Sequence, residues 1–121
     1  MNLRRVRAQD GRGMVTVELA VTTLAALALL MMMAWGIYLL VMQLRLVDTA
    51  AAVARQAARG DRTAVTRLTA AAPVGAAVAV VEKTDLVTVT VQLSARPLAG
   101  WLVTVPLTAQ AEVVPEPRGE P

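Results

Sequence analysis

The chain has 121 residues, of which 56% are hydrophobic and 17% are charged, and its formal net charge is +3. The sequence contains no cysteine, which excludes disulfides and thiolate metal sites, and no histidine, the commonest metal ligand and general base. This length leaves room for one small domain beside one membrane segment, so a large buried active site is not expected.

The positive charge is concentrated at the start of the chain. Residues 1–13 contain four arginines and Asp10, while the other eight basic residues of the chain are matched by eight acidic ones. A short basic head beside an apolar run is a topology signal rather than a phosphate-binding surface. The chain also lacks phenylalanine, a usual stacking residue for bases. We therefore interpret residues 1–13 as a basic cytoplasmic leader and expect no nucleic-acid partner.

An uncharged run follows over residues 19–42. As a helix it would be about 36 Å long at about 1.5 Å per residue, and a bilayer core is about 30 Å thick. The run therefore predicts a transmembrane helix. The arginines before it place the N-terminus in the cytoplasm and the C-terminal domain outside. Trp35 and Tyr38 near the outer end suit an interfacial aromatic belt or, alternatively, helix packing.

The helix is expected to continue beyond the membrane and to cover residues 14–60. Residues 43–59 contain neither proline nor glycine, and their charges recur at helical spacing. The apolar surface expected of this segment consists of Leu44, Val47, Ala51, Val53, Ala54 and Ala58. Gly60 is a typical helix stop, and Asp61 is a typical cap for a second short helix over residues 62–71.

After Pro73 the spacing of the apolar residues changes from a helical period to a period of two. Residues 76–82 are rich in valine, and residues 87–94 and 103–113 alternate apolar and polar side chains. Pro106 cannot donate to a ladder, which places the third strand at an edge or breaks it there. We expect an α+β fold with a small antiparallel three-stranded sheet. Its extracytoplasmic domain covers residues 61–114, and the proline-rich tail 115–121 is expected to be disordered.

Glu18 is the residue that most needs an explanation. An unpaired carboxylate at the entrance of a lipid-facing helix costs up to a few kcal/mol if it lies deep. One interpretation is an acid at the level of the lipid headgroups. The other requires a peptidase to cut after Gly13. Met14 then becomes the N-terminus, and its amine, four residues from Glu18, pairs with that carboxylate in the same chain or in a neighbour.

The segment Gly13-Met14-Val15-Thr16-Val17-Glu18 resembles the type IV prepilin processing motif, with a basic leader before it and a hydrophobic helix after it. The wider chain is similar to the TadE-like minor pilins, or pseudopilins, of the Flp (tight adherence) pilus system. The similarity includes the Ala-rich residues 48–60 and the Ala-rich strand with its acidic, proline-containing tail at residues 109–117. Met14 stands where type IVa pilins commonly have phenylalanine, and Leu19 stands where the major Flp pilins have tyrosine. The second departure favours a minor subunit.

The resemblance implies a pilin-like fold and processing by a prepilin peptidase between Gly13 and Met14, with Glu18 as the assembly residue. The implied partners are that peptidase, other pilins or pseudopilins, inner-membrane pilus assembly proteins and the lipid bilayer. The protein would be a single-pass membrane protein that is inserted into, or primes, a thin pilus. No catalytic, metal-binding or cofactor-binding residue is predicted, and we do not expect an enzyme.

Two other functions fit the same residues. A secreted binding module with a signal peptide would mature after about residue 34, although the apolar run is longer than the usual 7 to 15 residues. An unprocessed single-span anchor would scaffold another membrane protein through its Ala-rich helix, and its leader would stay intact. The mass of the mature N-terminus separates these alternatives from a processed pseudopilin.

Overall fold

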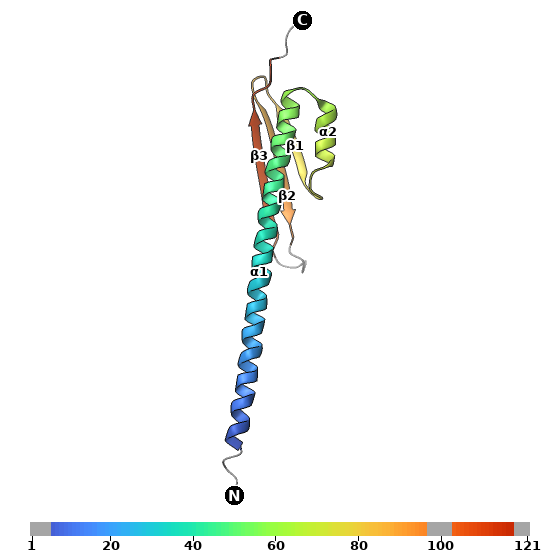
Figure 1. The fold of residues 1–121 in the computed structure, drawn as a ribbon. Coiled ribbons are helices and arrows are strands. Elements are labelled where there is room, and N and C mark those ends of the chain that lie inside the picture. The colour runs from blue at the N-terminus through green and yellow to red at the C-terminus, as the bar shows by residue number, and fades with distance from the viewer. Residues whose placement is uncertain (1–5, 97–102, 118–121) are drawn as a thin grey trace. The chain divides into compact units, whose positions relative to one another are not determined.

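The structure is a computed structural model that describes residues 6–96 and 103–117. Its elements are α1 (Val6–Ala58), α2 (Arg62–Ala70), β1 (Ala77–Glu82), β2 (Val87–Ala95) and β3 (Val105–Val113), as Figure 1 shows. This is the predicted α+β arrangement of a long N-terminal helix, a short second helix and a three-stranded antiparallel sheet. The chain divides into two compact units, Met1–Ile37 and Tyr38–Pro121.

Helix α1 begins earlier than the sequence predicts. Its first residue is Val6 rather than Met14, so the second half of the expected leader is helical. No proline interrupts this stretch, and once a helix has formed each added residue gains a hydrogen bond without a new nucleation cost. Gly11 and Gly13 each oppose this extension by about 1 kcal/mol relative to alanine. Residues 1–5 of the expected leader lie outside the described residues.

The end of α1 and the start of α2 confirm the predicted stop and cap. Gly60 has φ 75°, and its N–H donates to the carbonyl of Ala57 at 2.9 Å, while the N–H of Asp61 donates to that of Gln56 at 3.0 Å. This pair of bonds closes a helix end with a left-handed glycine. The Asp61 carboxylate then accepts from the N–H of Ala64 at 2.9 Å, which caps α2.

The sheet is an antiparallel meander with the order β1-β2-β3, which settles the strand order that the sequence leaves open. Val80 of β1 and Ala111 of β3 both lie opposite Val89 of the central strand. Pro106 lies opposite Ser94, and β3 continues through it as an edge strand. A proline is tolerated there because its missing N–H faces away from the partner strand.

The second half of α1 covers one face of this sheet and forms the core with it. Leu46, Val53, Val89 and Val91 are fully buried, and side chains of β2 alternate between buried and more exposed. Burying each valine or leucine contributes about 1.5–3 kcal/mol relative to leaving it exposed. The complete core is Leu46, Ala50, Val53, Ala54, Ala57, Val87, Val89, Val91, Leu93 and Ala109.

The sheet covers only part of the apolar surface that the sequence predicts for this half of the helix, which was expected to pack on its own domain or on neighbours. Leu44 and Val47 are 57% and 48% exposed, whereas Leu46 is fully buried. Residues two apart in an α-helix point in directions about 200° apart, since each residue turns the helix by about 100°. This part of α1 has apolar residues around much of its circumference, and the sheet covers only the face that contains Leu46, Ala50 and Val53.

Candidate functional site

The predicted site lies in the first unit, on the part of α1 whose described side chains are all exposed. Every side chain that the structure describes from Gly11 to Ala34 is exposed, including Met14 at 74% and Leu19 at 67%. By length and composition α1 is able to cross a membrane. A contiguous exposed apolar surface of this kind indicates contact with lipid or with other proteins.

The hydroxyl groups on this segment are satisfied within the helix. Thr16 donates to the carbonyl of Arg12 at 2.9 Å, Thr22 to that of Glu18 at 2.8 Å and Thr23 to that of Leu19 at 2.8 Å. A threonine bonded to the preceding turn exposes its methyl group and leaves no free donor. Such a helix therefore needs no polar partner at these positions in an apolar medium.

Glu18 is the only charged residue between Arg12 and Arg45. Its side chain is exposed, and within the described part of the chain the carboxylate has no ion pair or hydrogen bond. The residues one turn away on its face are Met14, Val15, Val21 and Thr22, none of which is basic. The structure therefore leaves this carboxylate without a cation one turn away within its own helix.

Gly13 and Met14 lie in the helical part of the chain, less than two turns before Glu18. A Cβ added to Gly13 would meet nothing within 4 Å, so no described residue packs against this position. The bond between Gly13 and Met14 is inside α1, and a peptidase requires local unwinding to reach it. Gly11 and Gly13 lower the cost of unwinding by about 1 kcal/mol each. The three predicted site residues, which are neighbours in the sequence, thus lie on one short stretch of α1.

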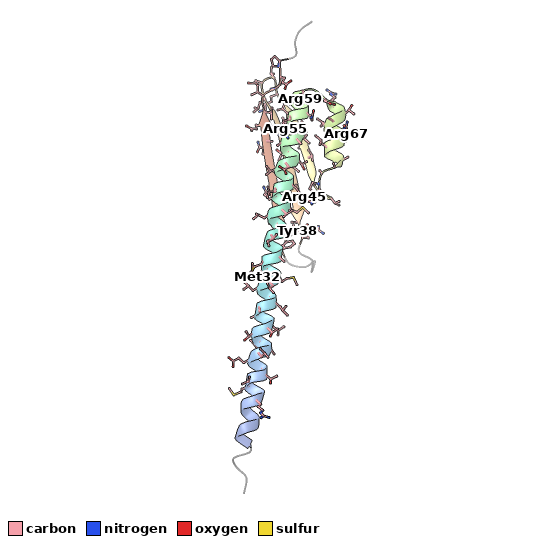
Figure 2. All side chains as sticks on the ribbon, viewed as in Figure 1. Met32, Tyr38, Arg45, Arg55, Arg59 and Arg67 are labelled. Atoms are coloured by element: carbon pink, nitrogen blue, oxygen red, sulfur yellow. The ribbon has the colours of Figure 1, made fainter. Side chains whose placement is uncertain are left out.

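Trp35 and Tyr38 lie near the junction of the two units, and both take part in side-chain interactions. The Trp35 side chain is half-buried, whereas Tyr38 is 40% exposed. Met31, Met32 and Met33, which precede them, are all exposed. Figure 2 labels Met32 and Tyr38 on α1. The interfacial role expected of Trp35 and Tyr38 stays a prediction.

The second unit has shallow hollows, and its described residues do not gather reactive groups in any of them. One hollow is lined by residues of the α1 end, the β1–β2 turn and the tail, including Ala58, Lys83 and Glu116. Among the side chains that the structure describes, in residues 11–96 and 103–117, no three Asp or Glu come together as a metal site would require, and no polar side chain is buried. That the protein is not an enzyme stays a prediction.

The contact between the α1 end and the tail could not be seen in the sequence. The Nε atom of Arg59 lies 3.7 Å from a carboxylate oxygen of Glu116, and the N–H of Glu116 donates to the carbonyl of Ala58 at 3.3 Å. Figure 2 shows Arg59 at the end of α1. No periodicity links residues this far apart in the chain, so only the fold reveals the contact. Disorder of the tail 115–121 stays a prediction, and residues 118–121 lie outside the described residues.

The fold defines a small α+β protein whose N-terminal helix, which carries Gly13, Met14 and Glu18, is apolar and long enough to cross a membrane. Comparisons with protein-family models, with curated proteins and with solved structures found no match for this chain. The function therefore has to be argued from the residues and their surroundings.

Proposed function

We propose that this protein is a TadE-like minor pilin, or pseudopilin, that is anchored in the cell membrane and serves as a structural and assembly component of Flp-type pili. The leader lies in the cytoplasm, α1 spans the bilayer and the second unit lies outside the cytoplasm. A prepilin peptidase removes the leader after Gly13. The partners are this peptidase, other pilins or pseudopilins and the inner-membrane assembly proteins.

One observation carries the proposal: Glu18 is a lone carboxylate on an exposed apolar helix, with Met14 one turn before it. A charge in an apolar medium requires an opposite charge to offset its desolvation. Cleavage after Gly13 would create such a charge, because the new amine at Met14 lies on the same helix face as Glu18.

Assembly would then use the same chemistry between subunits. When apolar helices pack side by side, the carboxylate of Glu18 in one subunit pairs with the Met14 amine of its neighbour. The exposed apolar side chains of α1 supply the lateral contact, and the charge pair sets the axial offset between helices. The satisfied hydroxyls of Thr16 and Thr22 allow this packing without unpaired donors.

The processing step is tested by the mass of the intact protein, purified from cells with and without a prepilin peptidase. With the peptidase we expect a mass that lacks residues 1–13 and an N-terminus at Met14. Gly13→Leu should block the cut, whereas Gly11→Leu, at an equally open position, should not. A protein that keeps Met1 in the presence of the peptidase would refute processing.

The assembly step is tested with Glu18→Gln. Membrane insertion should be unchanged, because the substitution removes a charge from an apolar helix. Incorporation into sheared pilus fractions should fall to background, since loss of one partner of a desolvated ion pair costs about 3–5 kcal/mol. Asp48→Asn, which also removes an exposed acid from α1, is the matched control. Equal incorporation of Glu18→Gln and wild type would contradict the role of Glu18.

One observation favours a second candidate, an unprocessed single-span anchor. The backbone of α1 is helical on both sides of the Gly13–Met14 bond, and a continuous helix protects its bonds from peptidases. In that case Glu18 would be an acid at the level of the lipid headgroups. The anchor predicts the full-length mass in every strain, so the same mass measurement decides between the two candidates.

A further inference from the structure

Beyond residue 42, helix α1 has an apolar face that the sheet does not cover. Leu44 and Val47 lie on this face and are 57% and 48% exposed, and Ala51, one turn further, is half-buried. The residues that pack against the sheet, such as Leu46 and Ala50, lie on another side of the same turns. The second unit therefore leaves one apolar side of its own helix without a partner in the chain.

Lipid does not account for this face. Arg45 and Asp48 lie on the same turns as Leu44 and Val47, and both charged side chains are exposed. Charged residues are costly in the hydrocarbon region of a bilayer, so these turns lie outside it. There, exposed leucine and valine side chains gain free energy by packing against another protein surface.

The spacing of the residues indicates what that surface is. Leu30, Met33, Ile37, Leu40, Leu44 and Val47 follow one another at alternating intervals of three and four residues, and each is exposed. We call these six residues the seam. The same spacing continues back to Thr16 and forward to Ala51 with no charged residue at any of its positions, which makes five heptads. A repeat of this kind over at least about three heptads indicates a coiled coil, with the seam at positions a and d.

The turns beyond residue 42 select this register from the possible ones. Within the uncharged run alone, several heptad registers are equally apolar. Moved by one residue toward the C-terminus, the repeat would contain Arg45 and Asp48. Moved by one residue the other way, it would contain Leu46 and Ala50, which the sheet already covers. Over residues 43–51 the seam is the register that avoids both the charged and the buried positions.

The polar and small residues of the first unit do not interrupt the repeat. Thr16 and Thr23 fall on it, and their hydroxyls donate to the carbonyls of Arg12 and Leu19 at 2.9 and 2.8 Å. Each threonine is therefore free to pack through its methyl group. Gly36 lies beside the seam, and an added Cβ there would meet nothing within 4 Å. A small residue at this position lets a second helix approach closely.

We propose that the seam packs against the seam of a second copy, as a parallel two-stranded coiled coil that begins in the membrane and continues outside it. Copies that α1 anchors in one membrane with one topology have parallel α1 helices, so the proposal rests on the anchoring part of the proposed function. It does not depend on cleavage after Gly13. Each seam residue meets its own counterpart, so the contact is a closed twofold dimer.

The charges beside the seam are compatible with this pair. In a parallel coiled coil, position e of one helix faces position g of the other. Asp48 occupies position e and therefore faces Gln43 of the second copy, an uncharged amide. Arg45 occupies position b, away from the contact. No like charges meet across the dimer.

Glu18 remains outside this contact. It occupies position c of the heptad, on the side of the helix away from a and d. Pairing of its carboxylate with the Met14 amine of a neighbour would therefore use another face of α1. The dimer and the Glu18 pair are separate contacts, and each has its own test.

Single cysteines test the dimer, because the chain has no cysteine of its own. The full chain is placed in membranes that lack a prepilin peptidase and is oxidised with copper phenanthroline, and dimers are read on non-reducing denaturing gels. Ile37→Cys, Leu40→Cys and Leu44→Cys should each give a disulfide-linked dimer, since each residue meets itself across the twofold axis. Met32→Cys and Arg45→Cys, at exposed positions off the seam, are the matched controls and should stay monomeric.

An added charge separates the seam from random encounter of the copies. Val47→Asp in the Leu40→Cys protein places two carboxylates against each other in the contact, so the dimer should fall to background. Arg45→Asp in the same protein adds an acid off the seam and should leave the dimer unchanged. Val47 is 48% exposed, and circular dichroism checks that the second unit keeps its fold. The dimer is read in membranes because dilution into detergent favours the monomer by mass action.

Three results would overturn the proposal: monomer at every seam position, equal cross-linking on and off the seam, or a dimer that survives Val47→Asp in a folded protein. Cross-links at Met33 but not at Leu44 would overturn it too, because in an antiparallel pair only residues near the middle of the repeat meet themselves. A failure of anchoring is seen separately, as loss of the protein from washed membranes. Absence of the dimer in an anchored protein leaves the roles of Gly13 and Glu18 to their own tests.

Discussion

The two units of this chain are both rich in apolar residues, but only one of them buries those residues within the chain. Along α1, every described side chain from Gly11 to Ala34 is exposed, whereas Leu46, Ala50 and Val53 of the same helix are fully buried. The buried residues are those against which the sheet packs, in the second half of the helix. An exposed apolar helix surface of this kind indicates contact with lipid or with another protein.

The largest expected effect concerns the exposed half. Leu24→Arg combined with Leu27→Arg should abolish membrane association, because an arginine at the centre of a spanning helix costs about 2.5–3.5 kcal/mol and a leucine contributes favourably. Both leucines are exposed, at 67% and 57%. Carbonate extraction of membranes measures the effect, with alanines at both positions as the control. Retention of the double-arginine protein in the membrane would show that α1 does not span it.

The next effect distinguishes the two faces of α1 in the second unit. Leu46→Ala should destabilise this unit by about 2–5 kcal/mol, since it leaves a cavity under the sheet. Leu44→Ala, two residues earlier and 57% exposed, should change the free energy of unfolding by no more than about 0.5 kcal/mol. Denaturant unfolding of the full chain in detergent, followed by circular dichroism, compares the two. Similar losses would mean that the packing face is assigned wrongly.

A smaller effect is expected at the end of α1. Gly60→Ala places a side chain at φ 75°, which costs about 1–2 kcal/mol in the left-handed region. Gly36→Ala, at an open helical position in the first unit, should leave the unfolding of the second unit unchanged. The thermal midpoint of each variant is the measurement. A Gly60→Ala protein as stable as wild type would show that the helix does not depend on this stop.

The smallest effect is expected from the ion pair between Arg59 and Glu116. Both side chains are mostly exposed, at 59% and 70%, and the atoms lie 3.7 Å apart. Arg59→Ala should therefore cost only about 0.2–1 kcal/mol, and the cost should shrink further in high salt. Denaturation at low and high ionic strength tests this, with Arg55→Ala, an exposed arginine one turn earlier, as the control. A loss that does not depend on salt would argue for a packing role of the Arg59 side chain.

The sequence by itself determined the local structure. A long uncharged apolar run predicted the helix, and Gly60 and Asp61 predicted its end and the cap of the next helix. A valine-rich segment and two segments that alternate apolar with polar side chains predicted the three strands. These features depend on neighbours within one or two turns or on the two faces of one strand, which is why composition and spacing reveal them. The grouping of Gly13, Met14 and Glu18 was equally visible, because all three lie on one stretch of helix.

Only the tertiary structure decided which surfaces meet. The helix is apolar at both Leu44 and Leu46, and the choice between these faces depended on where the sheet packs. The strand order, the hydrogen bond from Gln43 to Thr108 and the contact of Glu116 with Ala58 join residues far apart in the chain. Such contacts arise from the summed burial of many side chains, which no local pattern in the sequence contains.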